Sequence, residues 1–483
     1  MATYDYDIGI LGGGSAGLTI AAGSAMLGAR TLLVEKERSL GGDCLHFGCI
    51  PSKTLIKTAH VRHLIKQAGK FGLPEAPLKP VDYKAVARRI QSVIDLIQKH
   101  DSQERFCKLG ARVEFGSPRF NDENSIEIEG RTYSARNWVI ATGSSPAVPP
   151  IEGLDSTPYI TNREIFSLDH LPESMVVLGG GPIGIEMAQA FCRLGSKVTV
   201  IQMENQILGK EDKDLADQVM NVMSSEGVIF YLNASVLRVK ESGKEKEVVI
   251  KTADSELSLK CDTILVAIGR IFNLERLGLE NIGVEFDRRG LRLDDRLRTA
   301  QKHIYGAGDV TGQYLFTHAA GYEGGIVIRN AIFHLPVKTD YTNIPWCTYT
   351  DPELASIGMN ETRAKDAGIR YSVWTEPFRR NDRSLAEGEE NGVIKMILDE
   401  KEKPVGIQIL GPHAGELVSE WVAIMNGKSK LSTIASAVHP YPTLGEINKR
   451  VIGNFFAKKI YSEQVKKGLK FFFSLRGRAC EEK

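Results

Sequence analysis

Several features are scarce in this sequence of 483 residues, and each scarcity excludes a class of protein. Neither sign of charge is in excess, because 61 Lys and Arg residues stand against 60 Asp and Glu residues. A net charge of +1 argues against binding to nucleic acid, which needs a strongly basic surface. No apolar run reaches the roughly 18 consecutive residues that read as a membrane-spanning helix.

Cysteine is also scarce. The sequence contains seven cysteines, an odd number and far fewer than a secreted disulfide scaffold of this length would carry. No basic and apolar segment typical of a secretory signal precedes the first predicted strand, so we expect a cytoplasmic protein. A content of 42% hydrophobic and 25% charged residues is that of an ordinary globular protein.

A glycine-rich turn follows the first apolar run, Tyr6–Leu11, which is typical of a buried parallel strand. Gly12 would permit the tight bend, Gly14 would let the backbone approach a pyrophosphate, and Gly17 would let the next helix pack on the strand. Glu35 ends the following predicted strand, 18 residues beyond Gly17, where an acid accepts hydrogen bonds from a ribose. A glycine turn without a ligand is the alternative, but strand, helix and acid together favour a dinucleotide site.

The same pattern recurs over residues 175–202, again as strand, glycine turn, helix and strand. The residues equivalent to the three glycines and the acid are Gly179, Gly181, Gly184 and Gln202. Two such units in the same frame predict that two different dinucleotides bind.

The repeats and the proline punctuation near residue 150 divide the chain. We predict an α/β fold with two Rossmann-like dinucleotide-binding domains, a central segment and a C-terminal α+β domain. The expected parts are residues 1–150, 151–273, 274–341 and 342–483. The central segment contains another strand that runs into glycines and ends at Asp309, an acid placed to meet a ribose or polyol.

Two cysteines five residues apart, Cys44 and Cys49, lie between the first glycine turn and the next predicted helix. Zinc binding is one interpretation, but no second pair of cysteines or histidines has ligand spacing, and His46 alone leaves the site a ligand short. A helix beginning near the pair would lower the thiol pKa values and favour reversible disulfide chemistry. We therefore predict a redox dithiol and no metal site.

With both glycine turns, the segment Cys44–Lys53 and residues 306–309, the sequence resembles the FAD-dependent pyridine nucleotide-disulfide oxidoreductases. That family includes dihydrolipoamide dehydrogenase, glutathione reductase and mercuric reductase. The further matching pieces are residues 141–143, 267–270 and 349–358. The resemblance covers essentially the whole chain. It implies FAD in the first turn, with Glu35 on its adenosine ribose and Asp309 near its ribityl and pyrophosphate, NAD or NADP in the second, and a C-terminal dimerisation domain.

The resemblance also implies roles for individual residues. Cys49 would lie against the flavin and Cys44 would face the disulfide substrate, so that electrons pass from the nicotinamide through the flavin to this pair. Lys53 would lie near flavin N5 and pair with Glu186, for which an ordinary helix-surface acid is the alternative. The other residues expected at the cofactor sites are Gly42, Thr142, Gly143 and Gly269.

The sequence departs from the family at the residue that usually manages protons. Dihydrolipoamide dehydrogenase and glutathione reductase carry a His-Pro-Thr motif with a glutamate five residues after the histidine, whereas here Tyr441 precedes Pro-Thr and Glu446. A phenol with a pKa near 10 is a poor base at neutral pH, so proton transfer from a thiol should be slower by about 10²–10⁴. His439 is either a substitute base or a structural histidine. The resemblance implies that Tyr441 and Glu446 come from the second subunit of a homodimer.

Mercuric reductase resembles this chain in having tyrosine at that position, but it normally ends in a vicinal cysteine pair, whereas this tail has only Cys480. We expect a dihydrolipoamide dehydrogenase-like enzyme that acts on a small-molecule or protein-bound thiol or disulfide. The alternatives are a metal-ion reductase similar to mercuric reductase and a non-catalytic redox sensor that responds to NADH.

The second glycine turn favours NADH over NADPH. A 2′-phosphate needs arginine just past the second strand, but residues 202–206 contain none and include Glu204. Gly184, where NADPH-using relatives often have alanine, points the same way.

The last segment, residues 455–473, mixes lysines with aromatic residues. We expect its aromatic side chains to pack on the partner subunit while the lysines remain in solvent. Contact of this tail with a membrane surface is the alternative.

Overall fold

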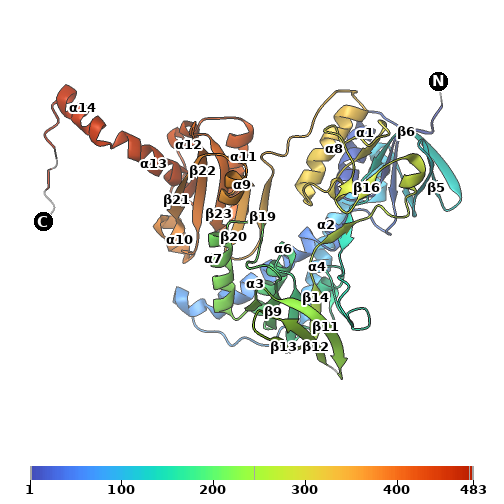
Figure 1. The fold of residues 1–483 in the computed structure, drawn as a ribbon, viewed down its shortest axis with the longest axis horizontal. Helices are drawn as coiled ribbons and strands as arrows, with labels where there is room; N and C mark the ends of the chain where they lie inside the picture. The colour runs from blue at the N-terminus through green and yellow to red at the C-terminus, as the bar shows by residue number, and fades with distance from the viewer. Residues whose placement is uncertain (1–2, 244, 478, 481–483) are drawn as a thin grey trace. The chain divides into compact units, whose positions relative to one another are not determined.

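The computed structural model describes residues 3–243, 245–477 and 479–480, and the chain divides into two compact units (Figure 1). Unit 1 runs to Gly209 and resumes from Met220 to Tyr341. Unit 2 contains Lys210–Val219 and the chain from Thr342 onward. Residues 210–219, which fall inside the segment expected to be the second nucleotide domain, therefore belong to unit 2.

The first sheet of unit 1 has the strand order β3-β2-β1-β6-β5-β4, and a further strand, β18, pairs with β6. Its strands are β1 (Tyr6–Leu11), β2 (Thr31–Glu35), β3 (Ala111–Phe115), β4 (Arg119–Asp122), β5 (Ser125–Ile128), β6 (Arg131–Ile140) and β18 (Ile304–Gly306). The pairings of β1 with β2 and β6, of β2 with β3 and of β18 with β6 are parallel. A continuous apolar strand such as β1 fits this position, because both faces of a parallel sheet are covered.

Helices α1 (Ser15–Met26) and α8 (Thr317–Ala331) pack against each other beside this sheet. Their apolar residues share one core with the strands, including Ile8, Ile20 and Val327. The two helices can approach closely because Gly324 of α8 lacks a side chain. A Cβ at Gly324 would lie 3.1 Å from Thr19 Cγ2 of α1. The predicted central segment thus supplies both a strand, β18, and a helix, α8, to the first sheet and the helices beside it, here called the first nucleotide-type layer. The second such layer is the other parallel sheet of unit 1 with its helices.

The second parallel sheet of unit 1 has the order β10-β9-β8-β14. These strands are β8 (Ser174–Leu178), β9 (Lys197–Ile201), β10 (Ile229–Tyr231) and β14 (Thr263–Val266). An antiparallel sheet of β11 (Ser235–Ser242), β12 (Glu245–Lys251) and β13 (Glu256–Cys261) follows. Two small antiparallel pairs join β7 (Ser144–Pro146) with β15 (Arg270–Phe272), and β16 (Phe286–Asp287) with β17 (Gly290–Leu291).

Helices α2 (Gly42–His46) and α3 (Cys49–Lys66) follow β2, and α3 packs on α6 (Pro182–Leu194) of the second nucleotide-type layer. The remaining helices of this part are α4 (Tyr83–Gln98) and α5 (Gln103–Leu109), and α7 (Lys213–Glu226) crosses from unit 2 back into unit 1. The packing of α3 on α6 brings residues from the two nucleotide-type layers into contact.

Unit 2 contains an antiparallel sheet with the order β19-β20-β23-β22-β21. Its strands are β19 (Pro345–Thr348), β20 (Glu353–Gly358), β21 (Tyr371–Pro377), β22 (Val393–Asp399) and β23 (Pro404–Gly411). Its helices are α9 (Glu361–Asp366), α10 (Asp382–Glu387), α11 (Ala414–Asn426), α12 (Leu431–Ser436), α13 (Glu446–Ile460) and α14 (Glu463–Phe473). Trp421 of α11 is fully buried in the core beside the sheet, and its indole Nε1 donates to Asn448.

Buried carboxylates hold residues 210–219 within unit 2. Glu211 accepts hydrogen bonds from Trp346 Nε1 at 2.5 Å, Ser356 Oγ at 2.7 Å and Gln408 Nε2 at 3.0 Å. The buried ammonium of Lys395 lies 3.3 Å from Asp212. Hydrogen bonds satisfy these buried polar groups, which would otherwise be costly. The observed α/β architecture with a separate C-terminal α+β unit confirms the predicted fold class.

Candidate active site

Cys44 lies in α2, and Cys49 is the first residue of α3. Both are free thiols, and Cys49 is exposed. A hydrogen bond from the Cys44 thiol is the largest influence on Cys49, whose pKa falls from 9.0 to about 6. The same bond, together with burial, raises the pKa of Cys44. One sulfur of the pair is therefore set to carry the negative charge and the other to keep the proton.

Two further groups stabilise the Cys49 thiolate. Thr317 Oγ1, at the first turn of α8, lies 3.4 Å from Cys49 Sγ, and the Lys53 ammonium lies one turn along α3. Both lower the Cys49 pKa. Lys53 Nζ also forms an ion pair with Glu186 Oε2 of α6 at 2.9 Å, and the Glu186 side chain is 7% exposed. A buried acid thus fixes the cation near the dithiol.

In the two glycine turns, some positions must be glycine because a side chain would collide with the backbone, whereas others have room for a side chain. A Cβ on Gly17 would lie 1.8 Å from Gly12 O, and Gly12 itself has a φ of +112°. In contrast, a Cβ on Gly14 would meet nothing closer than 3.8 Å, and a Cβ on Gly181 would meet nothing within 4 Å. Because the protein's own packing does not require glycine there, these two positions fit the close approach of a pyrophosphate to the backbone.

Glu35 and Gln202 occupy equivalent places beside the two glycine turns. Glu35 Oε2 accepts from Gly13 N at 2.7 Å, and Gln202 Oε1 accepts from Gly180 N at 2.9 Å. The Nε2 atom of Gln202 lies 3.5 Å from Glu204 Oε2. Each side chain therefore fixes its glycine turn, and the second turn has a carboxylate next to it.

Asp309 lies in a network that sequence reasoning did not anticipate. The Ser144 hydroxyl donates to Asp309, and burial raises the pKa of this carboxyl. Arg270 Nε donates to Ser144 Oγ at 2.6 Å, and its guanidinium forms an ion pair with Asp43 at 3.0 Å. These residues come from distant segments, and the adjacent glycines 143 and 269 have positive φ values.

Among the other expected residues, Thr142 Oγ1 donates to Asn273 O, and Gly42 lies against Gly14 with a φ of +61°.

The expected proton-transfer residues lie in unit 2. Tyr441 is 69% exposed, and its hydroxyl donates to Asp382 Oδ2 at 3.0 Å, which raises the tyrosine pKa. His439 Nε2 lies 3.1 Å from Glu420 Oε1 rather than beside Tyr441. Glu446 begins α13, and its buried Oε2 has no hydrogen-bond partner among the described residues.

Two family models, both of one protein family, match the chain. The pyridine nucleotide-disulphide oxidoreductase family matches residues 6–324, and the dimerisation domain of the same family matches residues 344–451. The chain belongs to the pyridine nucleotide-disulphide oxidoreductases. It is thus a flavoprotein disulfide oxidoreductase, and its dimerisation domain indicates a homodimer.

Individual relatives of this oxidoreductase differ in activity. The chain is 32% identical to the mitochondrial dihydrolipoyl dehydrogenase of Schizosaccharomyces pombe, over 93% of this chain and 89% of the relative. It is 30% identical to the mercuric reductase of Bacillus cereus, over 94% of this chain and 72% of the relative. The HOCl-induced flavoprotein disulfide reductase RclA from Escherichia coli is 28% identical, with a TM-score of 0.83 over 93% of this chain and 99% of that one.

Family members use FAD and NAD(P)H, and the residues of this oxidoreductase fit both groups at the places described. The first turn, with the open backbone at Gly14, would hold FAD, and the second, with Gly181, would hold the nicotinamide cofactor.

The part of the chain that the structure describes contains no group of three or more His, Cys, Asp and Glu side chains that could bind a metal ion. None of its helices has the length and hydropathy that crossing a bilayer requires.

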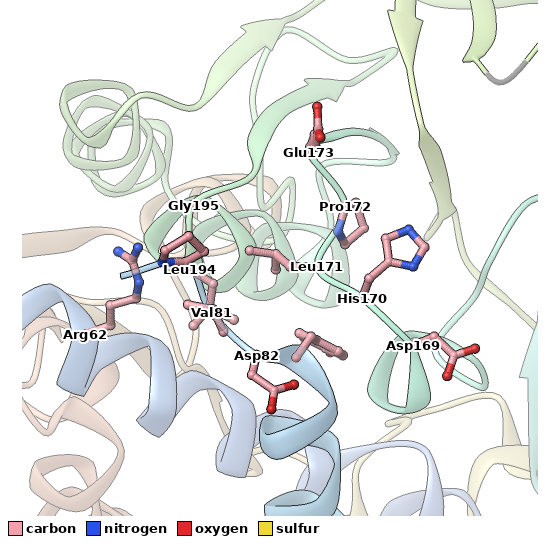
Figure 2. A pocket seen from close by; sticks show the side chains of 12 residues that line it. Arg62, Val81, Asp82, Asp169, His170, Leu171, Pro172, Glu173, Leu194 and Gly195 are labelled. Carbon is pink, nitrogen blue, oxygen red and sulfur yellow. The ribbon is translucent and has the colours of Figure 1, made fainter. Parts of the chain in front are cut away.

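A cavity of about 400 Å³ lies elsewhere in unit 1 (Figure 2). It is lined by Arg62 near the end of α3, residues 80–83 at the start of α4, residues 169–173, and Leu194 and Gly195 at the end of α6. None of the predicted catalytic or cofactor-binding residues lines it. The predicted dithiol site and this cavity are therefore separate.

Thr317 is the functional residue that sequence reasoning missed most clearly. It is the first residue of the helix that follows the glycine–acid turn at Asp309. This position in the sequence is the only local feature that could have drawn attention to it. The contact with Cys49 depends on α8 lying against α1, which no local pattern reveals.

Proposed function

We propose that this enzyme uses NADH to reduce a disulfide or a thiol-bound acceptor whose sulfur leaves as a thiolate. The observation that carries the proposal is the asymmetric dithiol, in which Cys49 has a pKa of about 6 and Cys44 keeps its proton. The dihydrolipoyl dehydrogenases and the disulfide reductase RclA among the relatives support a disulfide-type acceptor.

FAD, when bound, supplies hydride acceptance from the nicotinamide and delivery of an electron pair to the protein disulfide. In the reduced protein, Cys44 attacks one sulfur of the acceptor disulfide, the acceptor S–S bond breaks, and the first acceptor thiolate leaves. The Cys44 proton passes along its hydrogen bond to Cys49 Sγ. Cys49 then loses this proton to solvent and attacks Cys44 Sγ, which releases the second acceptor thiolate and restores the Cys44–Cys49 disulfide.

This sequence of steps explains how the enzyme would work with Tyr441 at the position of the usual histidine. Cys49 is ionised at neutral pH and accepts the hydrogen bond of Cys44, so its thiolate is the nearest acceptor for the Cys44 proton in the first exchange. Because a thiolate with a pKa of about 6 is a weak base, this transfer depends on an acceptor thiolate that leaves easily. The two residues at the usual proton-transfer position are poorly suited to protonate the leaving thiolates, because His439 lies against Glu420 and Tyr441 has a raised pKa. Acceptors with low thiol pKa values are therefore favoured.

The experiment compares anaerobic NADH oxidation with lipoamide and with an aromatic disulfide of low thiol pKa, for wild type and Tyr441→His. We expect the wild type to reduce the aromatic disulfide at least about tenfold faster, and Tyr441→His to raise lipoamide turnover by about tenfold or more. Cys44→Ser should abolish both activities while NADH still reduces the flavin. Equal wild-type rates with both acceptors would contradict the proposal.

We base the preference for NADH on Glu204, whose carboxylate lies 3.5 Å from Gln202 Nε2 beside the second turn. A 2′-phosphate at this position would face a like charge, which costs affinity. We expect kcat/KM to be lower with NADPH than with NADH by about tenfold or more, and we expect Glu204→Arg to reduce this difference between the two cofactors. An unchanged ratio in Glu204→Arg would contradict this assignment.

A second candidate is the reduction of a thiolate-bound metal ion. It is favoured by Tyr441, by the mercuric reductases among the relatives and by the Cu(II) complex of RclA, which is 27% identical with a TM-score of 0.83. Anaerobic NADH oxidation with Hg(II) or Cu(II), in the presence of excess small thiol, distinguishes the candidates. Turnover with a metal ion but with neither disulfide would replace the first proposal by the second.

A further inference from the structure

Helix α14, Glu463–Phe473, has no buried residue. Its side chains Phe471, Phe472 and Phe473 are 81%, 76% and 70% exposed, and Leu475 just beyond it is 51% exposed. Figure 1 shows α14 lying apart from the sheet of unit 2. The match to the family's dimerisation domain ends at residue 451, so this exposed apolar segment lies outside the matched domain.

The residues of α14 separate into two faces. Val465, Leu469, Phe472 and Phe473 share one face, because they follow the spacing i, i+4, i+7 and i+8. Glu463, Lys467 and Lys470 follow the spacing i, i+4 and i+7 on another face, and Lys466, which pairs with Glu463 at 2.9 Å, lies at the boundary beside Phe473. Ser462 accepts from Val465 N and so caps the beginning of the helix. The helix therefore carries an aromatic face and a predominantly basic one.

We propose that α14 binds the surface of a membrane containing anionic lipids. A short helix with phenylalanine and leucine on one side and lysine on the other lies in the plane of the interface, with its apolar face in the acyl boundary. The lysines complement the negative headgroups, which attract basic segments near the surface. A second copy of this chain would cover the apolar face but would leave the lysines without a partner of opposite charge, whereas an anionic membrane engages both faces.

Phe471 adds a third exposed aromatic side chain at the carboxyl end of α14. It lies outside the apolar face, its ring contacts Phe472 edge to face with centroids 5.1 Å apart, and it is the most exposed of the three phenylalanines. Together these aromatic side chains surround the carboxyl end of α14. That end would lie somewhat deeper than the rest of the in-plane helix, while Lys466 and Lys467 near its beginning would remain among the headgroups.

The test is co-sedimentation of the full-length, FAD-loaded protein with vesicles of phosphatidylglycerol and phosphatidylcholine in equal parts, beside vesicles of phosphatidylcholine alone. We expect binding to the anionic vesicles, weakened by salt. The variant Lys466→Glu/Lys467→Glu/Lys470→Glu should lower the partition coefficient by about a hundredfold or more. The variant Phe472→Ser/Phe473→Ser should also lower it, because it removes apolar contact.

A matched control changes net charge equally at exposed lysines of unit 2 outside α14, as Lys401→Glu/Lys428→Glu/Lys430→Glu. We expect this control to retain most of the vesicle binding. Equal losses in the two triple variants would overturn the proposal, since charge alone and not α14 would then explain binding. Absence of wild-type binding would overturn it as well. A deletion of residues 462–483 that converts the dimer to monomers would instead identify α14 as a contact between copies.

Discussion

Cys49 Sγ lies 3.4 Å from Thr317 Oγ1, although 268 positions separate the two residues in the sequence. The contact exists because Cys49 begins α3 and Thr317 begins α8, and the first turns of these helices meet. Cys44, Thr317 and Lys53 consequently act on one sulfur and lower its pKa. Three segments of unit 1 thus set the pKa of the Cys49 thiol.

We first predict that Thr317→Val raises the pKa of Cys49. A hydrogen bond to a charged group contributes about 1.5–3 kcal/mol, so its removal should raise this pKa by about one unit or more. The measurement is the ultraviolet absorbance of the thiolate against pH, in a Cys44→Ser background where Cys49 is the only thiol of the pair. Thr317→Ser keeps the hydroxyl and should behave as the background does; an unchanged pKa in Thr317→Val would contradict the assigned role.

Two glycines of the first turn should respond differently to alanine. Gly14→Ala should leave the fold intact, because its Cβ has 3.8 Å of clearance, but should lower FAD retention by about tenfold or more. Gly17→Ala should destabilise the protein itself, because its Cβ would lie 1.8 Å from Gly12 O. Circular dichroism melting and flavin content of the purified variants separate the two effects. Normal flavin content in Gly14→Ala would show that the pyrophosphate does not pass there.

Glu323 provides a prediction about pH. It is fully buried in α8, accepts hydrogen bonds from Gly308 N, Thr311 Oγ1 and Tyr341 OH, and has a pKa raised by burial from 4.5 to about 7. A raised carboxyl pKa means that the folded state binds more protons between pH 4.5 and 7, so this group's contribution to stability falls as pH rises through that window.

Glu323→Gln removes this titration. The stability of the variant relative to wild type should therefore increase between pH 5 and 8, by at most about 3 kcal/mol. Thermal unfolding midpoints at several pH values measure the effect. The exposed acid Glu390 gives a matched control, since Glu390→Gln should leave the difference from wild type constant with pH.

Lys395 should be required for residues 210–219 to remain attached to unit 2. Its side chain is 4% exposed and forms ion pairs with Asp212, Asp214 and Glu361. Lys395→Met leaves these carboxylates without that cation, and removal of one partner from a buried ion pair costs about 3–5 kcal/mol. We expect a lower unfolding temperature and faster proteolysis near residue 210. The exposed Lys213→Met is the control, and equal effects of the two variants would refute this role.

The sequence by itself determined the family and the two nucleotide-type units. Their glycine turns are local features, in which backbone conformation, strand and helix follow one another within about 30 residues. For the same reason the dithiol could be recognised from Cys44 and Cys49 alone. The match of both family models to the chain confirms the family, and the redox role of Cys44 and Cys49 stays a prediction.

The tertiary structure decided which distant groups act on these local features. Thr317 on the Cys49 sulfur, the Ser144–Arg270–Asp43 network beside Asp309, and the place of residues 210–219 in unit 2 all join segments far apart in the chain. Hydrophobic periodicity specifies which face of an element is buried but not which element covers it. Contacts between distant side chains therefore arise only when the sheets and helices pack.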